Sequence, residues 1–176
     1  MMTGLEPREF TWVIAGRLAV SERIGGYGFQ HRRVRREEEI AWLQANGVTA
    51  VLSLLDSNQN LAAYEAAGFS YGHQPLVDLE SETVTAVFEA IHSMLDMPGT
   101  VLLVHRDIID DPLAGLRAGY LVQSGLIEDP IVATGASLGI GIRPLGPDAR
   151  SISRWGASTC APGRRSVSAP TSAIES

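Results

Sequence analysis

The stretch VLLVHRDIIDDPLAGLRAGYLVQSGLIEDP, residues 101–130, carries the pattern that decides the fold. Its apolar start, residues 101–104, is typical of a strand covered on both faces, and His105 ends that strand. Residues 106–112 form a loop, and helical character follows over residues 113–122. In open α/β sheets, ligands bind where such a loop leads from a strand into a helix. We therefore expect a ligand site here, with helix amides that favour an anion.

Similar segments precede this one along the chain. Predicted strands lie at residues 10–14, 50–54 and 69–73. A predicted helix follows an arginine run, carries the Glu run of residues 37–39 in its first turn, and ends at Gly47. Residues 58–67 form a short helix, and an amphipathic helix runs from an N-cap at Ser81 to Leu95. Alternating strands and helices predict an α/β fold with a single mostly parallel sheet flanked by helices.

The chain has 176 residues, 45% of them hydrophobic and 19% charged, which suits one folded domain plus a tail. We place an N-terminal arm at residues 1–9, the domain at 10–149 and a disordered tail at 150–176. The net charge of −6 favours neither nucleic acid nor an anionic membrane as a partner. No apolar run resembles a signal peptide or a membrane span, and the single cysteine, Cys160, excludes an internal disulfide. We expect a soluble, cytoplasmic protein.

The segment 101–130 resembles the signature region of dual-specificity and related protein tyrosine phosphatases. Their pattern is an apolar strand, His-Cys, five residues, Arg with Thr or Ser, and a helix ending in a Tyr-Leu pattern. Three further segments resemble the same family in the same order: WVIAGRLA at residues 12–19, EEEIAWLQANGVTAVLSLLD at 37–56 and HQPLVD at 73–78. The resemblance implies the cysteine-phosphatase fold, and it places Asp78 at the position of the general-acid aspartate.

The loop departs from that family at several positions. Arg106 stands where the resemblance places the cysteine nucleophile, and a guanidinium has no lone pair with which to attack phosphorus. Pro112 stands where an arginine would grip the phosphoryl oxygens, and it offers neither a cation nor an N–H group. Ile109 stands where the family usually has a glycine that tolerates unusual backbone angles, and Leu113 replaces the usual hydroxyl residue. We therefore expect no intact catalytic residue in the degenerate loop: His105, Arg106, Asp107, Ile108, Ile109, Asp110, Asp111, Pro112 and Leu113.

Three carboxylates in that loop oppose phosphate binding. Asp107, Asp110 and Asp111 would each repel a phosphate charge by roughly 4 kcal/mol at ~4 Å and an effective dielectric constant of about 20. The same oxygens, together with Asp78, could instead hold a hard metal ion, although their spacing matches no known metal loop. The simpler interpretations are a solvated acidic loop paired in part with Arg106, a helix cap at Asp110 or Asp111, and a loop-stabilising Asp78.

Four arginines form a basic patch near the start of a predicted helix: Arg32, Arg33, Arg35 and Arg36. The patch could bind an acidic or phosphorylated protein partner, whose identity the sequence does not give. Such a run more often stays solvated and pairs with neighbouring carboxylates, which here follow at residues 37–39. Just before the patch, a glycine-rich segment at residues 25–28 fits a connecting loop better than a phosphate cradle, because no helix follows it directly.

These features together favour a pseudophosphatase, in which the phosphatase-like fold is kept and the role is binding or regulation, without a cofactor. His105 then has a structural role, as the resemblance implies. Cys160 lies in the predicted disordered tail, where no local feature lowers the pKa of its thiol, so we do not expect it to restore catalysis. Two alternatives stay open. One is a hydrolase that acts on phosphoesters through a metal ion or water held by the aspartates. The other is a degenerate gene product, against which the intact core pattern argues.

Overall fold

A single sheet of five strands forms the centre of the molecule. The computed structural model describes residues 4–26, 33–107, 115 and 119–121. The strands lie in the order β1-β2-β5-β3-β4. Their bounds are β1 Thr11–Ile14, β2 Leu18–Glu22, β3 Ala50–Ser53, β4 Ser70–His73 and β5 Leu102–Arg106. Only the pair of β1 and β2 is antiparallel among these strands, so the predicted α/β fold with a mostly parallel sheet is confirmed.

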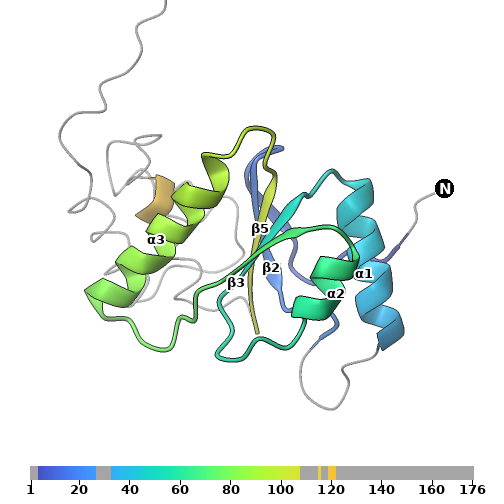
Figure 1. Cartoon of the computed structure of the whole chain (residues 1–176), viewed down its shortest axis with the longest axis horizontal. Helices are drawn as coiled ribbons and strands as arrows, with labels where there is room; N and C mark the ends of the chain where they lie inside the picture. Colours follow the sequence, from blue (N-terminus) through green and yellow to red (C-terminus); the bar gives the residue numbers. More distant parts are fainter. Residues whose placement is uncertain (1–3, 27–32, 108–114, 116–118, 122–176) are drawn as a thin grey trace, which may run out of the picture.

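β5 is the middle strand, and it pairs in parallel with β2 on one side and β3 on the other. Leu102 lies in register with both Leu18 and Ala50, and His105 lies in register with Ser21 and Ser53. The carboxyl ends of these strands therefore meet at one edge of the sheet, which is the lower edge in Figure 1. The predicted ligand site follows β5 at this edge, where the rule for open α/β sheets expects it.

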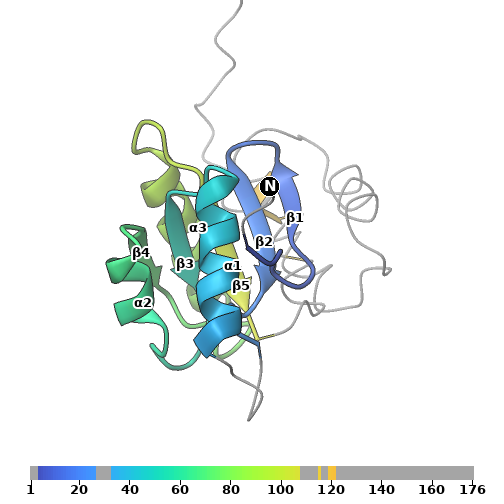
Figure 2. The same cartoon turned by 90° about the vertical axis from the view of Figure 1, so that its right-hand side faces the viewer.

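Helices cover both faces of the sheet, as Figures 1 and 2 show. α3 (Ser81–Leu95) packs its buried residues on one face, and α1 (Arg33–Ala45) and α2 (Leu61–Ala66) cover the other. Successive side chains of β5 point to opposite faces, so Leu102 and Val104 join the core beneath α3 while Leu103 joins the core beneath α1 and α2. The predicted flanking of the sheet by helices is confirmed.

The strand β2 has no counterpart in the prediction, which left residues 18–22 without an element. Its sequence LAVSE is short and mixes apolar with polar residues, so no local period marks it. Pairing with β5, more than 80 residues away in the chain, makes it a strand and buries residues Leu18 to Ser21. β5 itself ends one residue later than its predicted end at His105. Arg106 is therefore the last strand residue, in register with Glu22, rather than the first residue of a loop.

Two helix starts also differ from the prediction. α1 begins at Arg33, so residues 37–39 lie beyond its first turn and the arginine run opens the helix instead of preceding it. Arginine is a good helix former, which explains why the run is helical. In α3 the N-cap position belongs to Glu80, and Ser81 is the first helical residue. The Glu80 amide is instead bonded by the side chain of Asp78, at 3.1 Å.

The described part of the N-terminal arm packs against the domain. The Leu5 amide donates to the Glu38 carbonyl of α1 at 3.2 Å, and the Glu22 amide donates to the Arg8 carbonyl at 3.0 Å. Gly4 has a φ of +101°, and a Cβ there would lie 2.4 Å from the Glu38 carbonyl oxygen, so only glycine fits against the helix. No helix in the described ranges is long and apolar enough to cross a membrane. The predicted tail at 150–176 lies outside the described residues.

Candidate functional site

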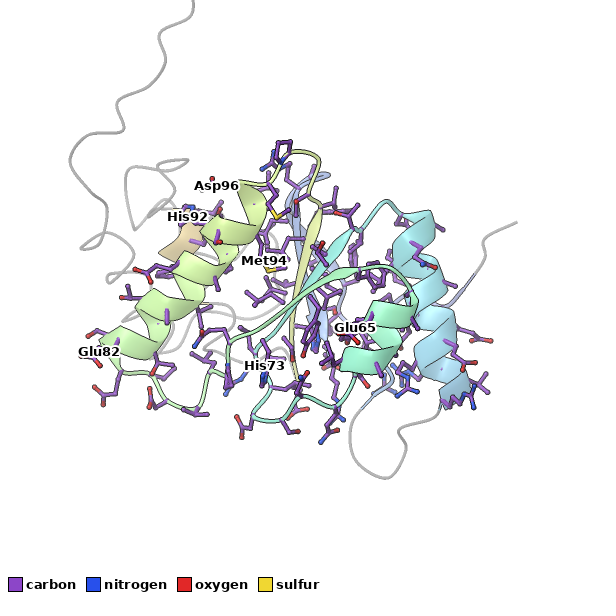
Figure 3. The ribbon with its side chains drawn as sticks, in the orientation of Figure 1. Glu65, His73, Glu82, His92, Met94 and Asp96 are labelled. Carbon is purple, nitrogen blue, oxygen red and sulfur yellow. The ribbon has the colours of Figure 1, made fainter. Side chains whose placement is uncertain are left out.

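The carboxyl edge of the sheet collects four connecting segments. They follow β2 at Arg23, β3 at Leu54, β4 at Gln74 and β5 at Asp107. His73, the last residue of β4, lies at this edge in Figure 3, far from His92 and Asp96 at the opposite end of α3. Its Nε2 atom lies 2.7 Å from the Leu55 carbonyl oxygen. The segments are thus held together by side chains that cross from one strand exit to the next.

Arg106 lies at the position that the resemblance assigns to the nucleophile. It ends β5, and its Nη2 atom donates to the carbonyl oxygen of Leu76 at 3.4 Å. Leu76 is buried and belongs to the segment after β4, where its own amide donates to the Leu54 carbonyl at 3.1 Å. The guanidinium therefore reaches across the edge to the segment that carries Asp78. Its chemistry is that of a fixed cation and hydrogen-bond donor.

Asp78 has a local role in the structure. Its side chain is exposed, and its Oδ1 atom accepts a hydrogen bond from the Glu80 amide at 3.1 Å. A short acidic side chain that bonds a backbone amide two residues ahead stabilises a turn. The turn leads the chain into α3. This geometry agrees with the loop-stabilising interpretation of Asp78.

Asp107 forms an ion pair with Arg23, a residue that the sequence analysis did not single out. The Arg23 Nη1 and Asp107 Oδ1 atoms lie 3.4 Å apart, with the arginine side chain 12% exposed and the aspartate 43% exposed. The Nη2 atom of Arg23 also donates to the side-chain oxygen of Gln59. Arg23 directly follows β2, so a prediction of β2 would have placed it at the carboxyl edge and made it a candidate. The loop residues 108–113, including Ile109, Asp110, Asp111 and Pro112, lie outside the described residues.

His105 is fully buried beneath α2 and belongs to a chain of polar side chains. Its Nε2 atom lies 3.1 Å from the Tyr64 hydroxyl, which in turn accepts from the Asn60 Nδ2 atom at 3.4 Å. Burial, together with the charge of Arg23 and the proximity of His73, lowers the pKa of His105 to about 3. The ring is therefore neutral at physiological pH. Burial likewise raises the pKa of Tyr64, so its hydroxyl stays protonated.

The described members of the predicted arginine patch differ in their surroundings. Arg33 is 83% exposed and pairs with Glu37 at 2.6 Å. Arg35 pairs with Glu39 at 2.6 Å, and the Glu39 carboxylate is fully buried and also accepts from the Gly25 amide at 2.7 Å. Arg36 donates to the Asn60 side-chain oxygen at 3.4 Å. Pairing with following glutamates thus accounts for two of these arginines; Arg32 lies outside the described residues.

The structure describes only some of the residues that could form a metal site. Of the three loop aspartates that could hold a cation, Asp107 alone is described, and it is paired with Arg23. Within the described ranges, no group of three or more His, Cys, Asp or Glu side chains is placed to hold a metal ion. The observed contacts therefore use Asp107 as the partner of an arginine.

Known proteins match this chain in structure and not in sequence. No protein-family model and no curated protein sequence matches it. The kinase-associated phosphatase KAP, with its catalytic-site cysteine replaced by serine, matches with a TM-score of 0.64 at 14% identity, covering 88% of this chain and 97% of that one. The core of the PP-IP phosphatase SIW14 from S. cerevisiae gives 0.61 at 11% identity, covering 86% of both chains. PTPMT1 gives 0.60 at 13% identity, with 85% and 95% covered.

The fold is that of the cysteine-dependent phosphatases of the tyrosine and dual-specificity type, as the sequence resemblance implied. The match extends over almost the whole length of each of these three proteins. At such low identities the likeness defines the fold, and the activity has to be argued from the residues at the carboxyl edge.

Proposed function

We propose that this chain is a pseudophosphatase: a protein with the cysteine-phosphatase fold that does not hydrolyse phosphoesters and acts through binding or regulation. The observation that carries the proposal is Arg106 at the end of β5, with its guanidinium bonded to the Leu76 carbonyl. In this fold the nucleophile comes from that strand end. A group that attacks phosphorus needs an available lone pair, and the guanidinium has none.

The surroundings of Arg106 support the same proposal. The next residue, Asp107, brings a carboxylate that is 43% exposed to the start of the loop, where it would repel a phosphate. The structural neighbour KAP has a catalytic-site cysteine, which is replaced by serine in the matching structure, whereas the single cysteine of this chain is Cys160, within the segment that we assign to a tail. The matching structures cover 85–88% of the chain, which supports a phosphatase-like domain at residues 10–149.

The role in binding is assigned to the face near the start of α1. Arg33 is the described arginine of the patch that is most exposed, and Val34 beside it is also exposed, at 65%. An exposed cation next to an exposed apolar side chain is suited to an acidic or phosphorylated protein segment. Reversal of charge at Arg33 should therefore weaken capture of such a partner, while reversal at the exposed Glu65 of α2 should not.

Hydrolysis of para-nitrophenyl phosphate tests the proposal directly. We expect no turnover by the wild-type protein above a no-enzyme blank, either alone or with added Mg²⁺, Mn²⁺, Ca²⁺ or Zn²⁺. Turnover that needs a divalent ion would support the alternative of a metal-dependent hydrolase. Turnover without metal, together with a phosphorylated protein intermediate, would show that the chain keeps a nucleophile and would refute the proposal.

A further inference from the structure

Three buried side-chain nitrogen atoms in the described part of the chain have no hydrogen-bond partner: Nε of Arg23, Nε of Arg36 and Nδ1 of His105. Buried polar atoms are nearly always paired in folded proteins, so each exception calls for an explanation. The three are not scattered over the molecule. All belong to one set of hydrogen-bonded residues at the carboxyl edge of the sheet, around Gln59 and Asn60.

Asn60 is the centre of this network. Its Nδ2 atom donates to the Ile24 carbonyl at 3.0 Å, which fixes the orientation of the amide because a carbonyl can only accept. The Asn60 Oδ1 atom accepts from Arg36 at 3.4 Å. The preceding residue, Gln59, accepts from Arg23. Two arginines, one from the exit of β2 and one from α1, are thus joined through adjacent residues of the segment after β3.

All three unpaired atoms are donors. The Nε atom of arginine always carries a hydrogen. For His105 the assignment follows from the chain of bonds: Asn60 donates to the Tyr64 hydroxyl, the hydroxyl donates to His105 Nε2, and the proton of the neutral ring is left on Nδ1. A network with surplus donors and no surplus acceptor is complementary to a species that only accepts.

The charges of the network also favour an anion. Arg23 has Asp107 as its carboxylate partner, at 3.4 Å, and that carboxylate is 43% exposed. For Arg36, the hydrogen bond found within the described residues goes to a neutral amide oxygen, and no ion pair is found there. Among the described residues, one positive charge therefore remains uncompensated beside two unused guanidinium donors. A water molecule could accept from these donors but could not balance the charge.

We propose that Arg23 and Arg36, held together by Gln59 and Asn60, bind a tetrahedral oxyanion of the phosphate type. The site lies between the exits of β2 and β3 and the side of α1, and its ligands are not residues of the loop after β5. Planar guanidinium groups bind phosphate oxygens through several N–H groups at once, which a single ammonium cannot do. The inference goes beyond the proposed function, since oxyanion binding here does not require the chain to be inactive.

Titration with inorganic phosphate, followed by calorimetry at constant ionic strength set with chloride, tests the site. We expect saturable binding to the wild-type protein, and roughly tenfold or greater weakening in Arg36→Gln. Arg17→Gln is the control, because it removes the same charge from an exposed residue just before β2, at the edge of the sheet opposite to the network, and its affinity should stay near that of the wild type. Arg36→Lys keeps the charge without the planar donors, so its phosphate affinity should lie between those of the wild type and Arg36→Gln.

Asp107→Asn provides a second test that does not depend on the stability of the arginine variants. Removing the carboxylate that competes for Arg23 should tighten phosphate binding several-fold, whereas Asp56→Asn, a loss of the same charge at an exposed neighbouring position, should change it less. Phenyl phosphate distinguishes the sources of the anion: binding as tight as that of inorganic phosphate indicates a phosphoryl group on a larger molecule, and much weaker binding indicates the free ion. If phosphate binds no better than chloride, or if Arg36→Gln and Arg17→Gln behave alike, the proposal is wrong.

Discussion

The hydroxyl of Tyr64 and the Nε2 atom of His105 lie 3.1 Å apart in the core, although 41 residues separate them in the chain. The contact joins α2 to the carboxyl end of the central strand β5, and the imidazole is fully buried there. A histidine held in this way cannot accept a proton without losing much of its stabilisation, because the buried charge would be poorly solvated.

Acid should therefore destabilise the fold through His105. Its pKa is about 3 in the folded protein and about 6.5 when unfolded, so unfolding takes up a proton between those values. The free energy of unfolding should fall as the pH decreases from about 6.5, by about 1.4 kcal/mol per pH unit from this residue. Urea unfolding at several pH values should show a shallower fall for His105→Gln. An unchanged pH slope in that variant, with His92→Gln as control, would contradict the assignment.

The buried carboxylate of Glu39 should contribute far more to stability than its neighbour Glu37. Both residues accept from an arginine four residues earlier at 2.6 Å, but Glu39 is fully buried and also accepts from the Gly25 amide. Glu39→Gln replaces an acceptor by a donor group beside Arg35, and it should cost roughly 2–4 kcal/mol of unfolding free energy.

Glu37→Gln is the matched control for this prediction, since it removes the same charge on the same helix from an exposed pair. It should have a much smaller effect, because exposed ion pairs add little. Chemical denaturation of both variants measures the difference. Equal decreases in unfolding free energy for Glu39→Gln and Glu37→Gln would mean that the burial of Glu39 does not contribute to stability.

Restoring two residues should not restore a phosphatase. Arg106→Cys combined with Pro112→Arg supplies a thiol and a guanidinium at the positions that the resemblance requires. We expect only weak hydrolysis of para-nitrophenyl phosphate, because Ile109 and the loop aspartates remain and Asp107 keeps its negative charge near the start of the loop. Adding Asp107→Asn should then raise the rate. Substantial turnover in the double variant alone would show that these residues obstruct phosphate less than we infer.

A side chain at residue 72 should destabilise the fold while Met94 is in place. A Cβ at residue 72 would lie 2.9 Å from the Met94 sulfur and 3.0 Å from a methyl carbon of Leu52, and Met94 points from α3 toward the sheet in Figure 3. Gly72→Ala should cost about 1–2 kcal/mol of unfolding free energy. In a Met94→Ala background the same change should cost markedly less, and a double-mutant cycle measures this coupling. Equal costs in both backgrounds would rule out the steric explanation.

The sequence predicted those parts of the fold whose signal is local. The apolar run before His105 and the helical period of residues 84–95 each lie within one element, and the structure confirms the helix and places the strand within one residue of its predicted bounds. β2 and the partners of the site depend on contacts between distant residues. Arg23 and Asp107 are 84 residues apart, and no sequence pattern near either residue predicts the ion pair between them. The arginine in place of the family's cysteine at residue 106 can be recognised because the apolar strand and His105 before it align this segment with the phosphatase pattern.

The central position of β5 has a consequence for how the chain folds. During synthesis from the N-terminus, the hairpin of β1 and β2 and the unit of β3, α2 and β4 can each form early. The two halves have no direct strand pairing in the described sheet and are joined only through β5, at residues 102–106. The apolar faces of the two halves therefore stay exposed to solvent until residues 102–106 have been synthesised. A chain truncated before residue 102 should remain one polypeptide whose two halves do not pair with each other, and it should aggregate instead of forming a smaller folded protein.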